Sequence, residues 1–338
     1  MVAKSPGLIV LFGSGETSAN GQKAFDWLFS QIEKPVRLAI LETPAGFQPN
    51  SDIVAGQIAD FVHEHLPNYS PQISLVPARK KGTAFSPDDS AILAPLDSAN
   101  AVFLGPGSPT YAVRQLMGSL AWEKVIAAHK SGAGLLLASA AAIAIGAFAL
   151  PVYEIYKVGE ELHWHPGLDF LGAYGVQVVF VPHWNNNEGG SKLDTSRCYM
   201  GQERFVKLLD MLPPDIPVAG IDEYTSLGLD IAAGKGFVIG KGSVTILRCG
   251  KSARFHAGDE FPLEEIGSFR MPKPADRMAL TSDHDGQAAP DDVMSLVRDR
   301  DDARAQHDWA AADSLREAIS ALGWEVEDTV LGPRVKRS

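Results

Sequence analysis

Short apolar runs alternate with amphipathic stretches through the first part of this chain, and most runs end in glycine or in polar turn residues. Stretches with helical periodicity, 21–32, 53–65, 110–119 and 120–130, separate most of these runs. Continuous apolar strands that alternate with amphipathic helices are typical of a parallel sheet with both faces covered. The pattern therefore predicts an α/β fold of three layers around a mostly parallel sheet. The predicted strands span 8–12, 36–41, 73–76, 101–104, 134–138 and 176–181.

The pattern of apolar positions changes after Pro217. Segments 218–223, 226–232, 236–239 and 243–248 have the composition of short strands, and tight turns that contain glycine join them. Strands joined by such turns usually pair antiparallel. The sequence therefore predicts a small antiparallel extension of the sheet.

The last part of the chain has a different composition. Residues 273–290 are rich in Pro, Asp, Gln and Gly, which is typical of a linker. Helical periodicity over 291–306 and 308–322 predicts a helical hairpin, with Asp308 as the N-cap of its second helix. We therefore expect an α/β domain over 1–272, a linker over 273–290 and a hairpin module over 291–338. The expected hairpin core sets Val293, Leu296 and Val297 against Trp309, Ala312, Leu315 and Ile319.

Composition and charge narrow the class of protein. Hydrophobic residues make up 45% of the 338 residues and the net charge is −11, which argues against a protein built mainly to hold nucleic acid or anionic lipid. Two cysteines are too few for a disulfide framework. The apolar stretch 133–150 contains a serine and two glycines, so we interpret it as a buried strand and helix rather than a membrane span. We expect a cytoplasmic protein that makes no membrane contact; a homodimer is compatible with the sequence.

Ser139 lies where the apolar run 134–138 gives way to a string of small helix formers. A serine at a tight junction between strand and helix holds its hydroxyl above the end of the sheet, beside the first N–H groups of the helix. Ligands of such sheets bind at the carboxyl ends of the strands. A buried serine that is bonded to a backbone carbonyl is the alternative interpretation.

Possible partners for this serine follow other predicted strands, in segments 12–17, 103–110, 181–184 and 220–223. A hydrolytic serine needs a base, a carboxylate that orients the base, and N–H donors for the oxyanion. His183 and Glu223 have the chemistry of the base and the carboxylate, and the amides of Gly107 and Ala140 have that of the donors. Alternatively, His183 serves packing, Glu223 is a solvated turn residue, and the glycine turn allows close packing of helix on strand.

These segments resemble a known family. The turn Phe103-Leu-Gly-Pro-Gly107, the Ser139 junction, the stretch 153–168 and Gly220-Ile-Asp-Glu-Tyr-Thr225 are similar to the serine peptidases of the cyanophycinase and aspartyl dipeptidase group. The resemblance covers about residues 8–249. It implies a fold like that of flavodoxin and the class I glutamine amidotransferases, and a triad on Ser139, His183 and Glu223. It also implies hydrolysis of a peptide or isopeptide bond beside an aspartate, with no cofactor.

The chain departs from the family pattern around the serine. Leu137 and Ala141 stand where glycine would relieve crowding, which favours a relaxed turn or a displaced hydroxyl, and Pro106 lacks a backbone donor. The rival hypothesis is therefore a binding module without catalysis. For a small peptide or amide substrate, the candidate binding residues are Glu16, Asn185 and Arg197.

Two further groups of side chains carry weaker signals. His163 and His165 alternate along a stretch but have no third ligand at suitable spacing, so we expect no metal site. Cys198 follows Arg197, whose charge would favour a thiolate, but the pattern favours a structural cysteine in a loop.

The C-terminal segment carries a second resemblance. Ala303-Arg-Ala-Gln-His-Asp-Trp309 with its continuation to Arg316, and the later Glu327-Asp-Thr329, are similar to the C-terminal module of cysteinyl-tRNA synthetases. The resemblance implies contact with tRNA. Residues 291–338 hold eleven acidic and seven basic side chains, so this module alone should bind RNA weakly. A hairpin docked on the main domain or on a protein partner is the alternative.

Overall fold

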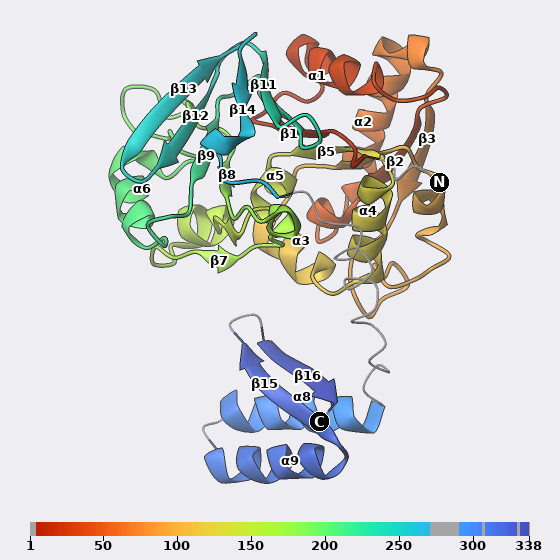
Figure 1. Ribbon diagram of the computed structural model, residues 1–338, viewed down its shortest axis with the longest axis vertical. Helices are drawn as coiled ribbons and strands as arrows, with labels where there is room; N and C mark the ends of the chain where they lie inside the picture. Colours follow the sequence, from red (N-terminus) through yellow and green to blue (C-terminus); the bar gives the residue numbers. More distant parts are fainter. Residues whose placement is uncertain (1–4, 271–290, 306–307, 330–331, 338) are drawn as a thin grey trace. The chain divides into compact units, whose positions relative to one another are not determined.

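The computed structural model describes residues 5–270, 291–305, 308–329 and 332–337. The chain divides into two compact units, Met1–Met271 and Pro272–Ser338 (Figure 1). The expected linker, 273–290, lies outside the described residues. Within the described ranges, no helix is long and apolar enough to cross a membrane.

An eight-stranded mixed sheet forms the centre of the first unit (Figure 1). Its five strands from β1 to β3 in the spatial order are parallel, and the other three strands continue it in antiparallel fashion. The predicted α/β class with a mainly parallel sheet is therefore confirmed. In spatial order the strands are β14 (Glu260–Pro262), β11 (Lys235–Gly240), β10 (Thr225–Asp230), β1 (Ile9–Phe12), β5 (Gly134–Ala138), β4 (Ala101–Leu104), β2 (Arg37–Leu41) and β3 (Gln72–Val76).

Both faces of this sheet are buried, as the continuous apolar strands require. In β1, Val10 and Phe12 belong to a core cluster formed with α1 and α2, whereas Ile9 and Leu11 belong to one formed with α3, α4 and α5. Successive side chains of a strand point to opposite faces, so one apolar run supplies two cores. The helices are α1 (Ala19–Phe29), α2 (Ser51–His65), α3 (Pro109–Leu116), α4 (Leu120–Lys130) and α5 (Ala140–Ala144).

A second sheet of four strands corrects one expectation. The segments after Pro217 do not form a single extension, because β10 and β11 join the main sheet whereas β9 and β12 pair in the second one. The chain crosses between the sheets from Ile221 to Thr225, since β9 pairs with the parallel strand β8 and β10 pairs with β1. The second sheet contains β13 (Lys251–His256), β12 (Ser243–Arg248), β9 (Val218–Ile221) and β8 (Val179–Val181), and α6 (Gly201–Asp210) contributes to the core beside it.

Short elements complete the first unit. Two two-residue strands pair antiparallel, and a π-helical segment between them in the chain belongs to the wall of the site described below. These elements are β6 (Phe148–Ala149), β7 (His165–Pro166), the π-helical η4 (Glu154–Val158), and the 3₁₀ helices η1 (Thr43–Ala45), η2 (Pro67–Tyr69), η3 (Ala94–Asp97), η5 (Phe170–Tyr174) and η6 (Leu263–Glu265).

The second unit has two helices followed by two paired strands. Asp308 accepts a hydrogen bond from the N–H of Ala311 at 3.1 Å, which confirms it as the N-cap of the second helix. Trp309 is 56% exposed, so its expected place in the core was wrong. Trp324 and Val326 of the unpredicted strand hairpin occupy the core instead. The elements are α8 (Asp291–Ala305), α9 (Trp309–Ala321), β15 (Trp324–Thr329) and β16 (Gly332–Arg337).

Candidate active site

Ser139 joins β5 to α5 in a conformation that is unusual for a residue with a side chain. Its φ is 50° and its ψ is −104°. The expectation of a relaxed turn was therefore wrong. Leu137 and Ala141 do not crowd the turn, because both side chains are buried in the core cluster on the α4 side of the sheet. Such backbone strain costs about 1–3 kcal/mol and persists only where the surroundings enforce it.

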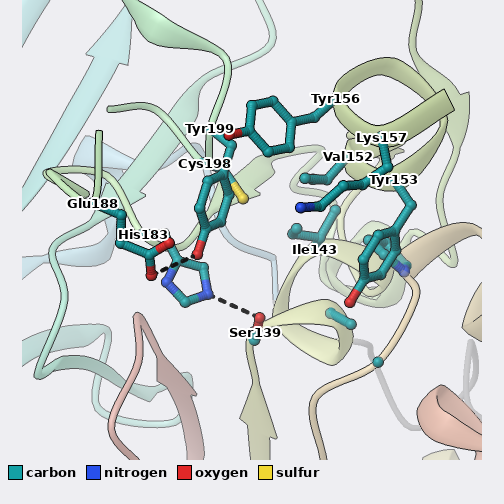
Figure 2. A pocket seen from close by; sticks show the side chains of 13 residues that line it. Ser139, Ile143, Val152, Tyr153, Tyr156, Lys157, His183, Glu188, Cys198 and Tyr199 are labelled. Atoms are coloured by element: carbon teal, nitrogen blue, oxygen red, sulfur yellow. Dashed lines mark hydrogen bonds between the residues drawn. The ribbon is translucent and has the colours of Figure 1, made fainter. Parts of the chain in front are cut away.

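His183 follows β8 and faces the serine. Its backbone also has a positive φ, 52°, and its N–H donates to the carbonyl of Gly13 at 3.0 Å. Gly13 also lies against the segment before Glu223, where a Cβ on it would be 2.1 Å from the Asp222 carbonyl oxygen. The imidazole Nε2 lies 3.0 Å from the Ser139 Oγ (Figure 2). Two sheets thus contribute one residue each to a hydrogen-bonded pair.

Glu223 lies in the crossing from β9 to β10, on the other side of the imidazole. Its Oε1 is 3.2 Å from His183 Nδ1 and also accepts a hydrogen bond from Asn186 Nδ2 at 2.8 Å. Its backbone N–H donates to Asn185 Oδ1 at 2.8 Å. The hydrogen bond from His183 holds the pKa of the Glu223 carboxyl below its usual value, against the opposing effect of burial. The carboxylate is therefore held ionised and in place.

A pocket of about 270 Å³ opens beside Ser139 (Figure 2). The N–H of Ala140, the first residue of α5, has no partner within the helix. Gly107 approaches the neighbouring loop so closely that a Cβ there would lie 1.9 Å from the Pro44 carbonyl oxygen. Both candidate oxyanion donors therefore belong to the pocket wall. The lining residues are Gly107, Pro109, Ser139, Ala140, Ile143, Val152, Tyr153, Tyr156, Lys157, His183, Glu188, Cys198 and Tyr199.

The three expected substrate-binding residues lie outside this lining. Arg197 places its guanidinium carbon 4.1 Å from the centre of the Trp184 ring and donates from Nη1 to the Trp184 carbonyl at 2.9 Å. Asn185 supports the backbone of Glu223. Glu16 is partly buried in the loop after β1. The side chains of Arg197 and Asn185 thus serve the framework of the site in this structure.

Sequence reasoning missed several residues of the pocket. Lys157 brings an ammonium group into the wall formed by 152–157, and Figure 2 shows it reaching into the pocket on the side away from His183. Glu188 and Tyr199 line the opposite wall, where the tyrosine hydroxyl donates to the Glu188 carboxylate at 3.1 Å. Asn186, which is 3% exposed, holds Glu223. The run of three asparagines at 185–187 is the sequence signal that could have identified Asn186.

Cys198 lines the pocket but has the properties of a structural cysteine. Burial raises the pKa of its thiol to about 12, so the proximity of Arg197 does not produce a thiolate. The Nδ1 atoms of His163 and His165 lie within hydrogen-bond distance of backbone carbonyls. Among the residues that the structure describes, no three His, Cys, Asp or Glu side chains are grouped to hold a metal ion.

Comparison with solved structures identifies the fold of the first unit. A peptidase from an acI-B1 actinobacterium superposes with a TM-score of 0.61 at 20% sequence identity, covering 77% of this chain and 98% of that one. A putative peptidase E protein from Listeria monocytogenes EGD-e gives a TM-score of 0.44 at 10% identity. No family model matches the sequence. The structural similarity to a peptidase that the sequence indicated is confirmed by the actinobacterial structure, and at 20% identity it concerns the fold alone.

Comparison with curated sequences identifies a second, shorter similarity. A cysteine–tRNA ligase from Methanosarcina mazei is 37% identical over 76 residues, which are 22% of this chain and 16% of the ligase. That of Burkholderia lata is 54% identical over 46 residues, 14% of this chain and 10% of the ligase. The chain thus spans only a small fraction of these relatives. The similarity of part of the chain to cysteinyl-tRNA synthetases is therefore confirmed, over 46 residues in one relative and 76 in the other.

Proposed function

We propose that the protein is a serine hydrolase that cleaves an amide bond. Ser139 Oγ bonds to the carbonyl carbon while its proton passes to His183 Nε2, and Glu223 orients the imidazole. The carbon–nitrogen bond then breaks, and the same proton leaves with the amine. A water molecule that His183 deprotonates releases the acyl group and restores the serine. The observation that carries this proposal is the chain of contacts at 3.0 Å and 3.2 Å that joins the three residues.

The surroundings of the serine support this chemistry. The positive φ of Ser139 belongs to the strained turn between strand and helix that exposes a nucleophile at the end of a sheet. The amides of Gly107 and Ala140 are the donors that we assign to the oxyanion, because both residues line the pocket beside the hydroxyl. The fold that the chain shares with a solved peptidase, together with the resemblance of its sequence to serine peptidases, favours hydrolysis over other acyl transfers.

The pocket supports a small polar substrate. Its volume of about 270 Å³ suits a ligand of dipeptide size better than a long chain. Lys157 is a cation in the wall, so an anionic group such as an aspartyl carboxylate beside the scissile amide would be bound favourably. The two proposals are separable, because hydrolysis rests on Ser139 and substrate choice rests on Lys157.

Labelling with a fluorophosphonate probe tests the hydrolase proposal. We expect covalent labelling of the wild-type protein and none of Ser139→Ala, because only an activated serine attacks the phosphorus. Glu223→Gln should lower the labelling rate roughly 10²–10⁴-fold, since a carboxamide orients the imidazole poorly.

Ser119→Ala is the matched control for this experiment. Ser119 also precedes a helix, caps α4 and lies outside the pocket lining. This variant should be labelled at the wild-type rate. Equal labelling of wild type and Ser139→Ala, or no labelling of either, would contradict the proposal.

A second candidate function rests on the similarity to cysteine–tRNA ligases. We propose as the alternative that the chain is a binding module that keeps the pocket and uses residues 291–338 to contact tRNA or a protein partner. Binding of tRNA that is lost on removal of residues 291–338, in a protein without Ser139-dependent labelling, would favour this candidate over the hydrolase.

A further inference from the structure

Residues 197–199 form one turn with a left-handed backbone. The φ values of Arg197, Cys198 and Tyr199 are 57°, 56° and 68°. Three consecutive residues with side chains rarely share this conformation, because each Cβ crowds the following carbonyl oxygen. Strain of this kind persists only where the surrounding structure enforces it, and strained residues cluster at functional sites.

Contacts with the residues at His183 hold the turn. The N–H of Arg197 donates to the Trp184 carbonyl at 2.9 Å, and the N–H of Cys198 donates to the His183 carbonyl at 3.1 Å. The Arg197 guanidinium packs on the Trp184 ring, and Cys198 is 2% exposed. The turn is therefore fixed to the strand end that carries the imidazole.

The turn presents the Tyr199 ring to the imidazole. The centres of the Tyr199 and His183 rings are 5.9 Å apart, with an angle of 48° between their planes. Figure 2 shows Tyr199 beside His183, in the wall of the pocket. The ring of Tyr156 packs on Tyr199 with the ring centres 5.3 Å apart, so the tyrosine is held on a second side.

Hydrogen bonds link this tyrosine to the carboxylate on the other side of the imidazole. The Tyr199 hydroxyl donates to Glu188 at 3.1 Å, and the N–H of Glu188 donates to Asn186 Oδ1 at 3.2 Å. Asn186 Nδ2 in turn donates to Glu223 at 2.8 Å. His183 is therefore enclosed by a circuit of contacts that begins at the Tyr199 ring and returns through Glu223.

We propose that Tyr199 is a positioning residue for His183, and that the left-handed turn places its ring so that the imidazole stays directed at Ser139. The inference rests on the proposed function for its catalytic consequence. Tyr199 takes no proton and touches no reacting atom in this role. Its ring restricts the rotation of the imidazole, and the hydrogen bond to Glu188 contributes less.

Two substitutions at one position test this role. Tyr199→Leu removes the ring, whereas Tyr199→Phe keeps the ring and removes only the hydrogen bond to Glu188. Fluorophosphonate labelling is measured as the maximal rate constant and the concentration for half-maximal rate. We expect Tyr199→Leu to lower the rate constant roughly 10–100-fold with little change in half-maximal concentration, since small misplacements of a base are costly. Tyr199→Phe should restore most of the rate constant.

Thermal unfolding of both variants shows whether a loss of labelling rate comes from a loss of folded protein, as a purely structural role of Tyr199 would require. Equal losses of rate in both variants, or a loss that appears only in the half-maximal concentration, would overturn the inference. NMR spectra of protein with isotope-labelled histidine, assigned with His183→Gln, give a readout that needs no reaction. The His183 ring signals should change in Tyr199→Leu and be retained in Tyr199→Phe; unchanged signals in Tyr199→Leu would overturn the inference. An unlabelled wild type would count against the hydrolase instead.

Discussion

His129, in α4, is a fully buried histidine whose two ring nitrogens find no hydrogen-bond partner among the described residues. Its ring packs edge-on against Phe170 and Tyr174, with ring centres 5.0 Å and 6.0 Å apart. Burial lowers its pKa from 6.5 to about 4, because the charged imidazolium would lose its hydration. This single residue therefore makes the stability of the first unit depend on pH.

The direction of this dependence follows from proton binding. Between pH 6.5 and about 4 the unfolded chain protonates His129 while the folded protein does not, so folding loses stability as the pH falls. The shift of the His129 pKa from 6.5 to about 4 corresponds to a loss of about 3 kcal/mol in the free energy of unfolding. Between pH 7 and pH 4, the free energy of unfolding should fall by about 2–3 kcal/mol less in His129→Leu than in the wild type. Urea unfolding at the two pH values measures this difference.

A matched control removes a different histidine. His63 is exposed on α2, and His63→Gln should keep the wild-type dependence of unfolding free energy on pH. An unchanged pH dependence in His129→Leu would show that the imidazole is hydrated or paired in the folded protein, contrary to the structure.

At the scale of elements, the ends of strands and helices carry more of the function than their interiors. Ser139, His183 and Glu223 follow β5, β8 and β9, while the buried runs before them only fill the core clusters of the first unit. The carboxyl ends of parallel strands meet at one edge, which is why polar residues after separate strands can converge. Positive φ angles at Ser139 and His183 show that the connections there are constrained.

The end of η2 supports a prediction about stability at this scale. Ser70 is exposed, with φ 49° and ψ 53°, in the left-handed conformation that glycine adopts without crowding. Removing the Cβ of Ser70 relieves its crowding against the following carbonyl oxygen, which is worth about 1–2 kcal/mol. This gain exceeds the entropic cost of about 0.5–1 kcal/mol that glycine adds. Ser70→Gly should therefore raise the free energy of unfolding by about 0.5–1 kcal/mol in urea titrations.

Ser70→Ala is the companion variant, because it removes the hydroxyl and keeps the Cβ. It should bring no gain in stability. If both variants were equally stable, the hydroxyl rather than the backbone would account for the effect of the glycine.

At the scale of the whole molecule, two compact units with separate cores share one chain. The first unit contains the candidate site, and the second contains the residues whose sequence resembles the C-terminal module of cysteinyl-tRNA synthetases. The net charge of the chain is −11, and residues 291–338 are also acidic on balance. Within them, Arg334, Lys336 and Arg337 form a local basic segment. Any binding of RNA by this unit should therefore be weak and sensitive to salt.

Measurements of tRNA binding at two salt concentrations test this expectation. If the second unit contacts tRNA, exchange of Arg334, Lys336 and Arg337 for alanine should weaken binding. The slope of binding against salt concentration should fall by the equivalent of at most about three phosphate contacts. Exchange of Lys23, Lys80 and Lys251, which are exposed in the first unit, is the matched control. Equal binding by the full chain and by residues 1–270 would remove the second unit from any RNA contact.

Most strands of the main sheet, and the position of the nucleophile candidate, could be predicted from the chain alone. Periodic burial is a local property, so the apolar runs predicted strands such as β1 and β5 within a residue or so of their observed ends. The same pattern placed Ser139 after a buried strand, and the composition of 226–232 and 236–239 indicated strands. Asp308 was identifiable because an N-cap is chosen by its own chain neighbours.

The surroundings of that serine depend on the tertiary structure. His183 is 44 residues from Ser139, and Glu223 is 40 residues from His183, so their contacts depend on how two sheets meet. The same packing turned Arg197 onto the Trp184 ring and brought Lys157 and Tyr199 to the pocket. The strain at Ser139 has the same origin, because the flanking side chains of Leu137 and Ala141 are buried in the core and do not crowd the turn. Local patterns encode burial, whereas the pairing of distant side chains is settled by the packing of the whole unit.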